Sequence, residues 1–178
     1  MNYKLIFTAI AVIAFSSVKS QENVIKVNPL GLAFGSTELS YERVLSEGSS
    51  LELAVAFTSV EANFTGADKS KVTGFGAEGK YKFYFSSSKV APRGWYGAPV
   101  VNFSSASGKS GSSEGKVSLF GAGAVAGYQW VFGGSDTGFA LDLNFGAQYV
   151  NAKTSGDISG ITLDGVLPRL GLSLGYAF

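Results

Sequence analysis

The chain contains no cysteine and no histidine among its 178 residues. The lack of cysteine excludes a disulfide framework, a thiolate metal site, a cysteine nucleophile and a lipid-modified cysteine. The lack of histidine removes the side chain that most often serves as general base or metal ligand near neutral pH. Charged residues make up only 15% of the chain, below the roughly 25% of an ordinary domain, which argues against disorder and against polyanion binding. What is present in quantity is apolar residues and glycine, in a length that suggests one domain.

The N-terminal residues have the three-part layout of a secretory signal peptide. Lys4 precedes the uncharged, mostly apolar run Leu5–Phe15, and small residues stand before a cleavage position at Gln21. The apolar run is too short to cross a membrane, because a spanning helix needs about 20 residues. We therefore expect residues 1–20 to be a cleaved signal peptide and residues 21–178 to form the single outer-membrane β-barrel domain.

The rest of the chain alternates between apolar and polar residues with a period of two. This pattern is typical of strands that have one apolar face and one polar face. In the clearest segment one face carries Phe139, Leu141 and Leu143, and the other carries Asp142 and Asn144. Eight such segments predict strands over 24–34, 37–45, 50–60, 71–85, 94–104, 116–132, 138–150 and 167–178.

The connections between these strands alternate in length. Short turns at one end of a sheet and long loops at the other are typical of transmembrane barrels. We therefore predict an all-β fold, an eight-stranded antiparallel up-and-down transmembrane β-barrel. Its closure would leave no unpaired sheet edge in lipid. The long, polar loops are expected at Glu61–Ser70, Ser105–Gly115 and Asn151–Val166.

The size of the residues on each face predicts which face points outward. Eight strands enclose a lumen barely wide enough for side chains. Gly121, Gly123 and Gly127 on the polar face suit such a lumen, whereas Phe120 and Trp130 on the opposite face would crowd it. The alternative is a soluble periplasmic lipocalin-like ligand-binding barrel, whose apolar face would point inward. In the membrane barrel, the residues expected at lipid or its interface are Phe34, Phe57, Phe83, Trp95, Trp130 and Tyr149.

The inward face is expected to collect charges of both signs. A buried charge without a partner is costly, so these residues should form a paired network that closes the lumen. A narrow gated pore is the alternative. No catalytic, cofactor or metal site is predicted, because Gly121–Gly127 lacks phosphate-loop spacing and the loop aspartates lack the spacing of a calcium loop. The lumen network is predicted to comprise Lys26, Asn28, Glu42, Glu52, Glu78, Lys80, Lys82, Asp142, Asn144, Gln148 and Arg169.

The C-terminal segment Leu170–Phe178 resembles the last strand of Gram-negative outer-membrane proteins, since it alternates and ends in an aromatic residue. Lys26–Leu32 and Leu39–Arg43 look like the opening strands of a poorly characterised family of small outer-membrane barrels. The chain after residue 20 is similar to the OmpA/OmpX-type small-barrel group. The resemblance implies location in the cell outer membrane and contact with its lipid and lipopolysaccharide. It also implies that Tyr176 and Phe178 form the signal read by the barrel-assembly machinery.

The same resemblance bears on function. Outer-membrane enzymes of similar architecture rely on histidine, which this chain lacks, so we expect a non-enzymatic protein without a cofactor. Its role would be structural in the envelope, or an interaction made by the long loops, such as adhesion. We expect the protein to be a monomer. We also expect it to bind no nucleic acid, because the sequence shows no basic patch.

Overall fold

The computed structural model describes residues 23–33, 35–62, 70–86, 90–110, 113–133, 137–157 and 163–178. The predicted signal peptide and Phe34 lie outside these residues. The described chain contains one helix of five residues, and no helix in these ranges has the length and hydropathy to cross a membrane. The elements are β1 (Asn23–Val27), α2 (Pro29–Ala33), β2 (Ser36–Ser46), β3 (Ser49–Ala62), β4 (Ser70–Tyr84), β5 (Gly94–Ser110), β6 (Ser113–Gly133), β7 (Gly138–Gly156) and β8 (Leu163–Ala177).

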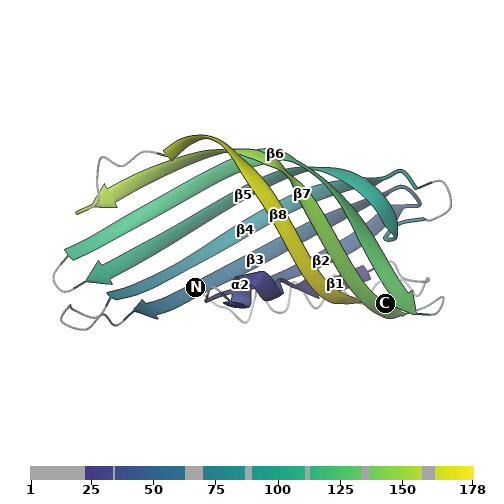
Figure 1. Ribbon diagram of the computed structural model, residues 1–178, viewed down its shortest axis with the longest axis horizontal. Helices are drawn as coiled ribbons and strands as arrows, with labels where there is room; N and C mark the ends of the chain where they lie inside the picture. The colour runs from purple at the N-terminus through teal and green to yellow at the C-terminus, as the bar shows by residue number, and fades with distance from the viewer. Residues whose placement is uncertain are drawn as a thin grey trace.

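The eight strands form one closed antiparallel ring (Figure 1). Each strand pairs with the next in sequence, and β8 returns to β1 between the pairs Val24–Ala177 and Val27–Leu174. Two backbone hydrogen bonds between Asn23 and Phe178, of 3.0 and 2.9 Å, extend this closure to the last residue. The prediction of an all-β, up-and-down arrangement of eight strands is confirmed.

The first predicted strand, 24–34, is wrong over its second half. β1 ends at Val27, and α2 starts at Pro29. Proline suits the first turn of a helix because its missing N–H needs no partner there. Asn28 caps the helix, since its Oδ1 accepts a hydrogen bond of 3.1 Å from the Gly31 N–H. The apolar residues of this segment are compatible with a strand as well as a helix, so the sequence pattern did not reveal where the helix begins.

Two of the three predicted long loops are also wrong over most of their length. In place of a loop at Ser105–Gly115, β5 continues to Ser110 and β6 begins at Ser113. In place of one at Asn151–Val166, β7 runs to Gly156 and β8 starts at Leu163. Both segments are rich in glycine and polar residues, so the alternation that marks a strand is weak in them, yet backbone pairing with a neighbouring strand requires no apolar face. The β5–β6 hairpin therefore forms a raised, polar rim at the left of Figure 1.

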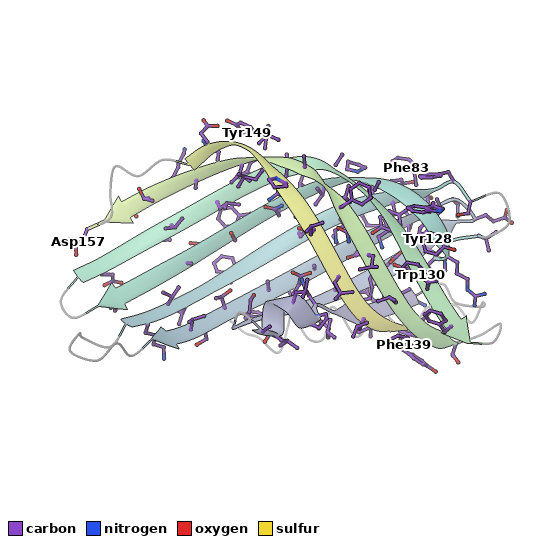
Figure 2. The ribbon with its side chains drawn as sticks, in the orientation of Figure 1. Phe83, Tyr128, Trp130, Phe139, Tyr149 and Asp157 are labelled. Atoms are coloured by element: carbon purple, nitrogen blue, oxygen red, sulfur yellow. The ribbon has the colours of Figure 1, made fainter. Side chains whose placement is uncertain are left out.

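The large apolar side chains lie on the outside of the ring. Phe57 is 64% exposed and Leu170 is 82% exposed, whereas the charged residues Lys26 and Glu42 are 0% exposed. Figure 2 shows aromatic side chains such as Phe139 projecting away from the ribbon. This direction matches the one predicted for the apolar face and is opposite to that of a lipocalin-like binder.

The outward aromatic residues lie near both ends of the ring. Phe139 and Tyr149 stand on β7 ten residues apart. At about 3.4 Å per residue and a strand tilt of about 40°, this separation spans about 26 Å along the ring axis. At the short-turn end, Trp95 packs edge-on against Tyr128 with ring centroids 5.1 Å apart. The spacing is close to the height of about 25 Å of the apolar band on a membrane barrel.

Candidate functional site

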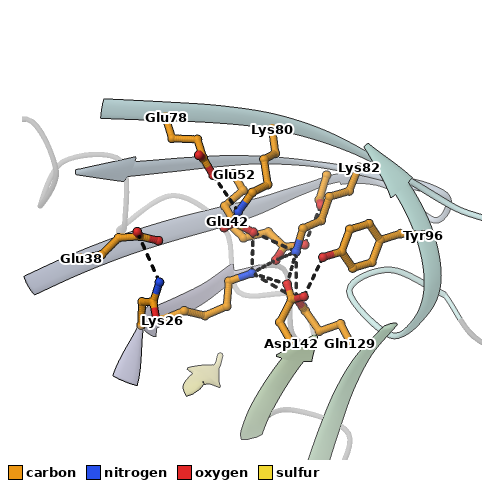
Figure 3. Close-up of polar contacts among 12 residues, drawn as sticks. Lys26, Glu38, Glu42, Glu52, Glu78, Lys80, Lys82, Tyr96, Gln129 and Asp142 are labelled. Atoms are coloured by element: carbon orange, nitrogen blue, oxygen red, sulfur yellow. Dashed lines mark hydrogen bonds and ion pairs between the residues drawn. The ribbon is translucent and has the colours of Figure 1, made fainter. Parts of the chain in front are cut away.

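A cluster of buried charges fills the lumen toward the short-turn end (Figure 3). We call this cluster, consisting of Lys26, Glu42, Glu52, Lys82 and Asp142, the plug. Lys26 Nζ lies 2.7 Å from Glu42, 2.6 Å from Glu52 and 3.1 Å from Asp142. Lys82 Nζ contacts the same three carboxylates at 3.0, 2.8 and 2.6 Å. Two ammonium groups are therefore shared among three carboxylates.

Sheet register explains why the plug needs both lysines. Glu42 on β2 stands directly opposite Glu52 on β3, and like charges in this position repel each other. Each lysine contacts both glutamates and so offsets this repulsion. Lys80 adds a third cation, 3.0 Å from the second oxygen of Glu52.

Hydroxyl and amide groups surround the plug. The hydroxyls of Ser50 and Tyr84 donate to Glu42 Oε1 at 2.6 and 2.7 Å, and the hydroxyl of Tyr96 donates to Asp142 Oδ1 at 2.6 Å. Gln129 Oε1 accepts from both plug lysines, at 3.1 and 3.0 Å, while its Nε2 donates to the Pro92 carbonyl at 2.9 Å. Gln129 therefore ties the plug to the segment that connects β4 and β5. Strands β1 to β7 each contribute a side chain to this network.

A second group of charges, Glu78, Lys80 and Arg169, lies on the long-loop side of the plug. Arg169 Nη2 contacts both oxygens of Glu78, at 2.5 and 2.6 Å, and Lys80 Nζ lies 3.0 Å from Glu78. Because Lys80 also contacts Glu52, the ion pairs continue from this group into the plug. Taken together, the two groups contain four cations and four carboxylates, so they are neutral as a whole.

The structure places most of the predicted lumen residues in these two groups. Gln148 accepts hydrogen bonds from Asn102 at 2.8 Å and from Arg169 at 3.0 Å. Asn28 lies outside these two groups but still lines the lumen, where its Oδ1 caps α2 and its Nδ2 donates to Glu38 at 3.5 Å. Asn144 points inward, but its Oδ1 is buried without a hydrogen-bond partner in the part of the chain that the structure describes.

The prediction missed several polar side chains of the lumen. Tyr84 continues the inward series of Lys80 and Lys82, and Tyr96 is one of the fully buried side chains. The signal that could have found them is the period of two, since Tyr84 stands two residues after Lys82 and Tyr96 shares the parity of Asn102 on β5. The predicted network also omitted Glu38, Ser50 and Gln129, although Gln129 stands on the face predicted to be polar.

The three plug carboxylates raise the question of a metal site. Oxygen atoms of Glu42, Glu52 and Asp142 all lie within 4.8 Å of one another, which is close enough for a divalent cation. The ammonium groups of Lys26 and Lys82 already occupy the space among these oxygens. The arrangement therefore neutralises the carboxylates internally and does not favour a metal ion.

A cavity of about 390 Å³ lies beyond the second charge group, toward the long-loop end. Its polar lining comes from β2, β4, β5, β7 and β8 and includes Glu38, Glu78, Asn102, Gln148 and Arg169. This volume is within the range of about 300–1,000 Å³ that is usual for small-molecule sites. The lumen is thus filled by the plug at one end and hollow at the other.

Comparison with known proteins identifies a family for this chain but no individual relative. A family model with the description "Protein of unknown function (DUF3575)" matches residues 5–157. No curated protein and no solved structure matches the chain. The matched residues include all five residues of the plug.

Proposed function

We propose that this chain, which belongs to the DUF3575 family of proteins of unknown function, is a non-enzymatic β-barrel of the outer membrane. Its lumen is closed by the plug, and its role is in envelope structure or in interactions made by the raised rim. The observation that carries the proposal is the reversal of the usual burial pattern. Leu170 and Phe57 face outward, whereas Lys26 and Lys82 are fully buried. Lipid around the ring accounts both for the apolar side chains on the outer surface and for the charged side chains in the lumen.

The lengths of the strands support a membrane location. A tilted strand needs about 9–11 residues to cross a bilayer. β6 has 21 residues and β7 has 19, so at the long-loop end both continue well beyond the outward Phe120 and Tyr149. The rim formed by the β5–β6 hairpin is joined to the end of β7, since Glu114 and Asp157 share backbone and side-chain hydrogen bonds of 3.0 and 2.9 Å. In the proposed orientation this rim stands above the lipid headgroups and carries the contacts with lipopolysaccharide.

The last strand supports the proposed route of assembly. Phe178 pairs with Asn23 where the ring closes, and Tyr176 is 53% exposed on the outer surface. We propose that these two aromatic residues are recognised by the barrel-assembly machinery after the signal peptide has directed the chain through the inner membrane. The ring closes within a single chain, so a monomer suffices.

The first test is gel mobility in SDS of the chain without residues 1–20, refolded into detergent. A closed membrane barrel stays folded in cold SDS, so the unheated sample should run at a different position from the boiled one. A matched sample that was not refolded before loading should show only the unfolded band. A single unfolded band in the refolded sample would contradict the proposal.

Conductance separates the closed barrel from the gated pore. The refolded chain in a planar lipid bilayer should give no steady current, because the plug leaves charged side chains in direct contact across the lumen. Glu78→Gln should also stay closed, because Glu78 lies outside the plug. A steady current through the unaltered chain would instead support the narrow pore.

A further inference from the structure

The ring is closed over only part of its height. β1 has five residues, and its pairing with β8 stops at the Val27–Leu174 pair. Beyond that pair, residues Leu163–Ser173 of β8 pair with β7 on one side, and in the described part of the chain they have no strand on the other side. Among the described strands, residues Ser36–Glu38 of β2 pair only with β3, while the Glu38 carbonyl accepts a hydrogen bond of 3.3 Å from the Asn28 N–H. The strand pairing of the wall between β2 and β8 therefore has a gap, where α2 contacts both strands and lies beside β8 in Figure 1.

The polar cavity of the lumen lies directly behind this gap. Glu38 on one side of the gap and Arg169 on the other both line the cavity. Arg169 is neutralised by its two-oxygen contact with Glu78. Glu38 has one weak contact, 3.5 Å from Asn28, and no ion pair within the described residues. Figure 3 shows Glu38 standing apart from the plug. The charged residues of the cavity lining are Glu38, Glu78 and Arg169, so Glu38 is a carboxylate in excess.

An apolar hollow of about 450 Å³ adjoins the cavity on the outer surface. Leu170 lines both spaces, and Asn28 in the cavity is followed two residues later by Leu30 in the hollow. The remaining wall of the hollow includes Trp95, Trp130 and Leu143. A polar space with a negative charge thus continues past one leucine into an apolar groove that faces outward.

We propose that the gap between β2 and β8 is a lateral portal that binds an amphiphile with a cationic head and an alkyl chain. The head enters the cavity and pairs with Glu38, and the chain lies in the hollow against Leu30 and Leu170. An ammonium head supplies three donors, which suits the Glu38 carboxylate and the carbonyl groups on the free edge of β8. This inference rests on the proposed membrane barrel, because the hollow must face the lipid for such a molecule to reach it.

The two tryptophans of the chain provide a direct readout, because both line the hollow. The probe is dodecylammonium with a brominated chain, which quenches tryptophan fluorescence on contact. It is added to the full chain extracted in dodecyl maltoside. The same brominated chain on a neutral maltoside head and on an anionic sulfate head measures quenching by simple partition into the micelle. We expect half-maximal quenching at about tenfold less ammonium probe than maltoside probe, as for one charge-assisted hydrogen bond.

Three variants assign the preference to Glu38. Glu38→Gln should remove the difference between the probes, and Glu38→Asp should keep most of it because the charge remains. The control is Glu114→Gln, which removes an exposed carboxylate of the rim and should leave the preference unchanged.

Each other outcome overturns the portal. Equal quenching by all heads, preference for the sulfate head, or a preference that persists in Glu38→Gln would each refute recognition by Glu38. If the gel mobility of the same sample in SDS changes on boiling, these results refute the portal but leave the proposed membrane barrel standing. If the sample shows no such change, the proposed membrane barrel fails and the portal fails with it.

Discussion

Replacing Lys82 by methionine tests whether the plug is a mutually neutralised unit. Lys82 Nζ contacts Asp142, Glu52 and Glu42 at 2.6–3.0 Å and is fully buried. Lys82→Met keeps most of the side-chain volume but removes the charge, leaving buried carboxylates without enough partners. Removing one partner of a buried ion pair costs about 3–5 kcal/mol. We therefore expect the free energy of unfolding to fall by that amount.

The assay is urea unfolding of the chain in lipid vesicles, followed by tryptophan fluorescence. With a slope of about 2 kcal/mol per M, the expected loss lowers the midpoint by about 1.5–2.5 M urea. Adding Asp142→Asn to Lys82→Met removes a negative charge as well, so the double variant should regain at least about 1 kcal/mol relative to the single one.

Lys109→Met is the matched control for this prediction. Lys109 makes an ion pair at 3.0 Å with Glu114, but the side chain of Lys109 is 68% exposed. Exposed pairs contribute only about 0–1 kcal/mol, so this substitution should leave the midpoint nearly unchanged. The reasoning is refuted if Lys82→Met costs less than about 1 kcal/mol, or if the double variant is less stable than Lys82→Met alone.

Three further substitutions, and Gly165→Ala as a control for one of them, test the faces, packing and hydrogen bonds of the ring by the same urea midpoint. Leu143→Arg places a charge on the outward face and should cost about 2–4 kcal/mol in lipid; an unaffected midpoint would argue against lipid contact. Gly127→Ala would bring a Cβ within 2.6 Å of the Tyr96 hydroxyl and should cost about 1–3 kcal/mol, whereas Gly165→Ala, with open space around it, should cost far less. Tyr96→Phe removes the donor to Asp142 Oδ1 and should cost about 1–3 kcal/mol; no loss would mean that this hydrogen bond contributes little.

Much of the fold follows from local sequence pattern. Side chains in a strand alternate between two faces, so Leu143 and Asp142 had to lie on opposite sides of the sheet wherever β7 was placed. Eight alternating segments, joined by connections that alternate between short and long, predicted the antiparallel ring. The departures occur where this signal is weak. Pro29 starts a helix inside an apolar segment, and Ser105–Ser110 forms a strand in which apolar and polar residues alternate only weakly.

The residue types of the lumen were therefore determined by the sequence alone, since parity along each strand selects the inward charges. The sequence did not determine which of these residues contact one another. Lys26 and Asp142 are 116 positions apart in the chain and meet only because strand tilt and ring closure bring β1 and β7 to the same height of the lumen. The gap between β2 and β8 likewise depends on where β1 stops pairing, which no alternation within one strand encodes. Local periodicity fixes the direction of a side chain, whereas the register between strands decides which atoms it reaches.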